Sequence, residues 1–104
     1  MKKLPAHYSK LKERHGSLID AVETLGKAVK TAGPLDAMTA ELIQLAAAVA
    51  IRAEGSVHSH TRRALTNGAT HEQVRHTAVL LTSVVGFPAV AAALTWIDDV
   101  IEGS

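Results

Sequence analysis

Residues 41–68 read ELIQLAAAVAIRAEGSVHSHTRRALTNG and carry the clearest structural signal in the chain. Their first eleven residues are apolar around most of a helical circumference, which is typical of a buried helix. We predict that this helix covers residues 36–53 and that Gly55 marks its end. Ser56 is then placed to cap a following helix that continues to Gly68.

Helical signals continue on both sides of this segment. Residues 8–31 have apolar side chains mostly at three- and four-residue steps, which predicts an amphipathic helix that ends at Gly33-Pro34. On the other side, THEQ at residues 70–73 fits a capping box that opens a further helix. A last helix follows GFP at residues 86–88 and reaches about residue 102. Nothing alternates with the period of a strand, so the chain is predicted to be all-α, with about five helices.

Length and composition limit how such helices can pack. With 104 residues, a single domain over residues 1–104 is expected. Hydrophobic residues make up 47% of the chain but aromatic residues only 3%, so the core must consist of Ala, Leu, Val and Ile. A domain this small cannot bury all its apolar surface alone, which predicts a homo-oligomer that associates through apolar helix faces. Residues 77–97 are uncharged and long enough for a bilayer, yet the break at residues 86–88 favours two buried helices and no membrane span.

Charge and cysteine content exclude several function classes. Eleven basic and ten acidic residues nearly cancel, which argues against a nucleic-acid partner. The N-terminal segment lacks an apolar run followed by a small-residue cleavage site, so a cytoplasmic location is expected. The chain has no cysteine, which excludes disulfides, thiolate metal ligands and thiol chemistry as it is written.

Three residues of the 41–68 segment are candidates for chemistry: Glu41, Ser56 and His60. Ser56 and His60 are four residues apart and so share one helix face, and Ser56 would lie where a helix N-terminus stabilises negative charge. Each has a simpler explanation: Ser56 as an N-cap, Glu41 as a partner of the helix dipole, and His60 as a surface histidine. Only their joint spacing favours a functional site.

The histidine spacing does not indicate a metal site. His58 and His60 are two residues apart and point to different faces of a helix, and His71 and His76, five apart, are no better placed. A metal ion would need further ligands from elsewhere in the chain, so neither a metal nor another cofactor is predicted.

The segment resembles the Cys-x-x-Cys-x-x-x-His segment of the carboxymuconolactone decarboxylase and AhpD-like alkylhydroperoxidase family, followed by an Ala-Leu stretch and a Gly-Ala-Thr turn. Anchored on His60, the family's second cysteine falls on Ser56 and its first on Ala53. The family's relay glutamate falls on Glu41. The resemblance covers residues 10–101 and implies an AhpD-like helical bundle that assembles as a trimer or hexamer.

The resemblance also implies a reaction. In family members with both thiols, the second cysteine attacks a peroxide as a thiolate, the first resolves the sulfenic acid as a disulfide, and glutamate and histidine move protons. This is a peroxiredoxin-like antioxidant function that uses a small-molecule peroxide and a thiol reductant. A serine hydroxyl neither ionises near neutral pH nor follows the sulfur oxidation ladder, so the chain as written is expected to be inactive as a peroxidase.

Two residues of the family pattern therefore need an explanation. Three explanations are open for Ser56. It is an engineered replacement of a cysteine, or the cysteine was lost naturally, or the site performs acid–base chemistry that never needed sulfur. Ala53 indicates a one-cysteine branch, in which any resolving thiol comes from elsewhere.

Two other functions stay open. A cofactor-free decarboxylase acting on a carboxymuconolactone-like organic acid, as the family name implies, would use His60 as proton donor. Its carboxylate anchor would be one of three arginines, Arg52, Arg62 or Arg63. A non-catalytic, ligand-binding oligomer would tolerate the loss of either Glu41 or His60 in every assay.

Overall fold

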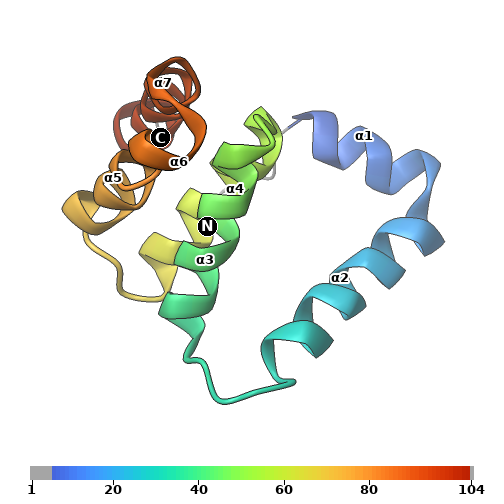
Figure 1. Cartoon of the computed structure of the whole chain (residues 1–104). Helices are drawn as coiled ribbons and strands as arrows, with labels where there is room; N and C mark the ends of the chain where they lie inside the picture. The colour runs from blue at the N-terminus through green and yellow to red at the C-terminus, as the bar shows by residue number, and fades with distance from the viewer. Residues whose placement is uncertain (1–5, 104) are drawn as a thin grey trace. The chain divides into compact units, whose positions relative to one another are not determined.

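The computed structural model describes residues 6–103, which form seven helices and no strand (Figure 1). The prediction of an all-α protein is confirmed. The helices are α1 (Ala6–Arg14), α2 (Gly16–Lys30), α3 (Ala37–Ala50), α4 (Glu54–Thr66), α5 (His71–Val79), α6 (Thr82–Val85) and α7 (Phe87–Gly103). They fall into two compact units, one within residues 1–34 and the other within residues 35–104.

The first unit contains α1 and α2, where one helix was predicted over residues 8–31. That prediction is wrong at His15, whose ψ of 50° lies outside the helical region. His15 is therefore the N-cap of a separate helix, α2. Gly16 follows, and glycine is among the weakest helix formers. The two helices are joined through Glu23, whose carboxylate accepts a hydrogen bond from the Tyr8 hydroxyl and lies 3.5 Å from Lys12 Nζ.

The second unit begins with α3, which starts where the sequence predicts. Asp36 is its N-cap, and its carboxylate accepts a hydrogen bond of 2.8 Å from the backbone N–H of Thr39. Buried side chains of α3 pack against α4, and α4 and α5 both contact α7. The largest fully buried side chains are Leu45, Ile97, Val49, Val57, Val74, Val90 and Thr61. The core is therefore aliphatic, as the composition predicts; Trp96 is half-buried against it, whereas Phe87 is exposed and not part of it.

The turn between α3 and α4 differs from the prediction. The last residue of α3 is Ala50 and its C-cap is Ile51, and Arg52 then adopts a positive φ of 55° that is uncommon outside glycine. The Arg52 N–H bonds to the Val49 carbonyl at 3.1 Å and the Ala53 N–H to the Ala48 carbonyl at 3.0 Å, which is the hydrogen-bond pattern of a Schellman C-terminus. Gly55, predicted to end the helix, instead lies inside the first turn of α4.

The uncharged segment over residues 77–97 is divided as expected. It contains the end of α5, the short α6 and the start of α7, and Gly86 with a φ of 92° separates α6 from α7. Pro88 occupies the first turn of α7, where the absence of an N–H does no harm. Within residues 6–103, no helix combines the length and the apolar character needed to cross a membrane. The capping box of Thr70 and Gln73 is present at the start of α5, as predicted.

Candidate functional site

A carboxylate and an imidazole meet between α3 and α4. Glu41 lies in the second turn of α3 with only 2% of its surface exposed, although glutamate is rarely buried without a partner. Its Oε1 lies 2.8 Å from Nδ1 of His60, on α4. The His60 side chain is 19% exposed, so one side of the pair is enclosed and the other is reachable from solvent. Two of the three candidates proposed from the sequence are thus in direct contact.

This contact determines what the imidazole offers to a reactant. When the Glu41 carboxylate is ionised it can only accept a hydrogen bond. Nδ1 of His60 therefore carries the proton and donates the hydrogen bond to Oε1 of Glu41. The neutral ring then presents the lone pair of Nε2, which suits a general base, and the protonated ring offers Nε2–H as a general acid. A carboxylate that holds one ring nitrogen and so fixes the tautomer in this way is common behind reactive histidines.

Ser56 lies in the first turn of α4, but it is not the N-cap. Ala53 occupies that position and makes no capping bond, and Ser56 is the third residue of the helix. The reason is that Arg52 turns the chain earlier than the sequence suggests, so α4 begins at Glu54. Ser56 is exposed and lies one turn before His60 on the same face. No hydrogen bond joins Ser56 to either Glu41 or His60 in the described part of the chain.

Two buried polar oxygens close in sequence to the pair were not found by sequence reasoning. Gln44 Oε1, three residues after Glu41 on α3, and Thr61 Oγ1, next to His60 on α4, lack a hydrogen-bond partner within residues 6–103. Most buried polar atoms in proteins have a hydrogen-bond partner, so these two oxygens are available as acceptors. Gln44 shares the helix face of Glu41, and the three-residue spacing was the only sequence signal for it.

The arginines considered as carboxylate anchors lie on the same segment. Arg52 and Arg63 are exposed, whereas Arg62 is half-buried. Burial, and to a smaller extent the charge of Arg63, lowers the pKa of Arg62 below its ordinary value. Among the described residues, none of these three arginines forms a hydrogen bond with His60.

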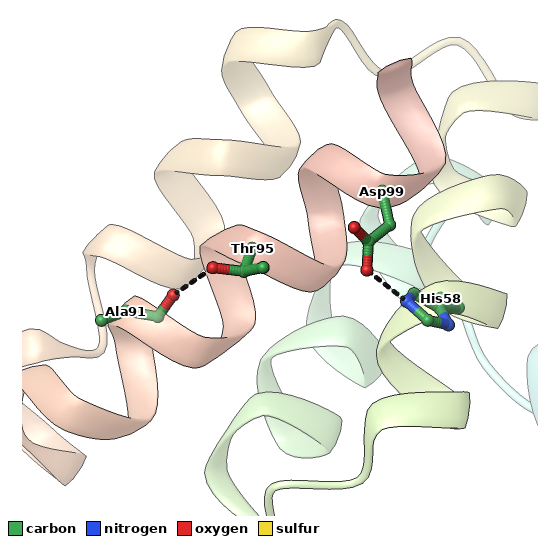
Figure 2. A network of polar contacts seen from close by, with 4 residues as sticks. All are labelled: His58, Ala91, Thr95 and Asp99. Atoms are coloured by element: carbon green, nitrogen blue, oxygen red, sulfur yellow. Dashed lines mark hydrogen bonds and ion pairs between the residues drawn. The ribbon is translucent and has the colours of Figure 1, made fainter. Parts of the chain in front are cut away.

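A second cluster of titratable groups joins α4 to α7. Nε2 of His58 lies 3.3 Å from Oδ2 of Asp99. Figure 2 shows these two side chains pointing toward each other from α4 and α7. Glu54 supplies a third group from one turn earlier on α4. One ligand atom from each of these three residues lies within 4.8 Å of the other two. Sequence reasoning considered His58 only as a partner of His60; the four-residue spacing of Glu54 and His58 was visible, but Asp99 is 41 residues away from His58.

Within residues 6–103, seven helices and a carboxylate–imidazole pair between two of them define an all-α protein with a candidate acid–base site. The chain belongs to the carboxymuconolactone decarboxylase family, whose model matches residues 17–99. It is similar to the crystal structure of an apo carboxymuconolactone decarboxylase family protein from Legionella pneumophila, with a TM-score of 0.73 and 27% identity. That likeness covers 90% of this chain and 87% of the other. No curated protein matches the chain significantly.

Proposed function

We propose that this chain has the architecture of an AhpD-type peroxidase, with Glu41 and His60 as its proton relay and Ser56 at the nucleophile position. The observation that carries the proposal is the 2.8 Å contact between the buried Glu41 and His60, at the family spacing from Ser56. As written, the chain lacks the sulfur and is expected not to reduce peroxides.

The chemistry explains why the relay and the sulfur are both needed. A thiolate at position 56 attacks one oxygen of a hydroperoxide, the O–O bond breaks, and the sulfur becomes a sulfenic acid. The departing alkoxide takes a proton, which the imidazolium of His60 supplies while Glu41 stabilises its charge. Because position 53 is alanine, one external thiol condenses with the sulfenic acid to a mixed disulfide and water, and a second external thiol then displaces the sulfur at position 56 as a thiol. The partners are accordingly a small-molecule peroxide and a thiol reductant.

The test is to restore the sulfur with Ser56→Cys and to follow the consumption of an organic hydroperoxide with a dithiol reductant. A matched control is Ser83→Cys, which places a thiol on an exposed position of α6, in a different helix from the relay. We expect peroxidase activity in the first variant, near-background activity in the control, and loss of the gain when Glu41→Gln or His60→Ala is added. Equal rates for the two cysteine variants would refute the proposal.

The decarboxylase alternative is supported by one observation, the half-buried Arg62. Such an enzyme needs a cation that holds the carboxylate of the organic acid next to the proton donor. Turnover of a carboxymuconolactone-like acid by the unchanged chain, abolished by both Arg62→Gln and His60→Ala, would favour this function over the peroxidase.

We also propose that the chain is a cytoplasmic homo-oligomer, a hexamer or a trimer. Along α2, four large apolar side chains at helical spacing are exposed in the single chain: Leu18, Val22, Leu25 and Val29. Exposed apolar stripes of this kind usually mark a surface that another subunit covers.

A further inference from the structure

A set of metal-ligand side chains links α4 to α7, apart from the Glu41–His60 pair. Glu54 and His58 are one turn apart on α4, so they project on the same side of that helix. Asp99 approaches them from α7, with its Oδ2 3.3 Å from Nε2 of His58 (Figure 2). His58 and His60 are two residues apart, which directs them to different faces of α4.

The two carboxylates of this cluster have no lysine or arginine partner in the described part of the chain. Glu54 and Asp99 bring two carboxylates within 4.8 Å of each other, which is repulsive when both are ionised. Within residues 6–103, no lysine or arginine forms an ion pair with either of them. The neighbouring Asp98, by contrast, is paired with Nε of Arg75 at 3.0 Å. The arrangement has two acidic groups around one imidazole, which forms an ion pair with Asp99 only when it is protonated.

We propose that Glu54, His58 and Asp99 bind a divalent first-row transition-metal ion of the zinc type. Nitrogen and oxygen ligands about 2.0–2.1 Å from a tetrahedral zinc ion lie about 3.3 Å from one another, which is the His58–Asp99 separation. An imidazole ligand favours such an ion over Ca²⁺ or Mg²⁺, which prefer oxygen ligands alone. Water completes the coordination, since Glu54 and Asp99 are exposed.

The ion would stabilise the packing of α4 against α7. Glu54 and His58 lie on α4 and Asp99 lies on α7, and these two helices pack against each other, so an ion bound by all three residues would connect them. A metal ion that binds only the folded arrangement stabilises it by an amount that grows with the logarithm of its concentration relative to the dissociation constant. The proposal is independent of peroxide chemistry, because none of its ligands belongs to the relay.

The test is a titration of the full chain, freed of any histidine tag, with Zn²⁺ in a calorimeter. We expect one tight site per chain, at least tenfold weaker affinity in both His58→Ala and Asp99→Asn, and no change in His71→Ala or Glu102→Gln. The last two remove an exposed histidine and an exposed carboxylate outside the cluster. Asp99→Asn preserves the side-chain shape, and circular dichroism of each variant verifies that it is folded.

Two further readouts separate this site from loose binding to surface groups. Co²⁺ should give the intense visible absorption of a low-symmetry, tetrahedral-type site, and that band should disappear in His58→Ala. Zn²⁺ should raise the melting temperature of the unchanged chain but not of the two ligand variants. Mg²⁺ should not raise the melting temperature of any of the three proteins. Equal affinity for Zn²⁺ in the unchanged chain and in His58→Ala, or an equal rise in melting temperature, would overturn the proposal.

Discussion

Removing the Glu41–His60 contact should destabilise the protein by an amount that a double-mutant cycle isolates. A hydrogen bond to a charged group contributes about 1.5–3 kcal/mol, roughly twice the value for a neutral pair. The two side chains are 3% and 19% exposed and their atoms are 2.8 Å apart, so solvent screens the contact poorly. We therefore expect a coupling energy of about 1.5–3 kcal/mol between Glu41→Ala and His60→Ala.

The cycle is preferable to single variants because Glu41 has other interactions and because alanine leaves a cavity. Both contributions occur in each background and cancel in the coupling term. Urea unfolding can be followed through the fluorescence of Trp96, the single tryptophan, which packs against the core. Protein concentration must be fixed, since an oligomer's stability depends on it.

The control cycle uses Arg75 and Asp98, which lie 3.0 Å apart but are each 40% exposed. Exposed pairs of this kind typically contribute about 0.2–1 kcal/mol. If the coupling between Glu41 and His60 is no larger than that between Arg75 and Asp98, then burial does not strengthen the contact and the reasoning about the relay fails.

Two further predictions concern a helix cap and the assembly. Hydrogen bonds from Thr39 lower the pKa of Asp36 in the folded chain, so its contribution to stability is present above the unfolded pKa, about 4, and is lost as pH falls through the folded-state value. Asp36→Ala should therefore lower the melting temperature at pH 7 but not at pH 2, and an equal difference at both would contradict this. Val22→Glu places a charge in the exposed apolar stripe of α2, and light scattering coupled to size exclusion should show smaller particles; an unchanged mass would exclude that stripe from the interface.

Most of the fold was predictable because it follows from local signals. The cap at Asp36, the capping box at residues 70–73 and the glycine at position 86 each fix a boundary through their own side chain or backbone freedom. The ends that were missed lack such signals. Arg52 adopts the left-handed conformation that is usually found at glycine. An arginine at that position does not predict such a conformation. His15 interrupts an otherwise regular amphipathic pattern in a different way, because its φ stays negative and its ψ of 50° leaves the helical region.

The candidate site also has some residues that the sequence could predict and others that it could not. The spacing on α4 places Ser56 and His60 on one face from sequence alone, and family resemblance added Glu41, although only the packing of α3 on α4 brings it to His60. The Glu54–His58–Asp99 cluster depends on a contact between α4 and α7, which no pattern within either helix reveals. Residues on one helix can be related by periodicity, whereas residues on two helices require the tertiary fold.

The displacement of Ser56 from the cap to the third position of α4 sharpens the question of what the residue does. A capping hydroxyl would be needed for the helix, and its replacement would confuse structural and chemical effects. At the third position Ser56 makes no capping bond, yet it still lies in the turn whose backbone N–H groups lack helical acceptors and favour an anion. A sulfur introduced there is exposed to that field without any loss of helix stability. Activity gained by Ser56→Cys would then report on the chemistry of the site and not on the folding of α4.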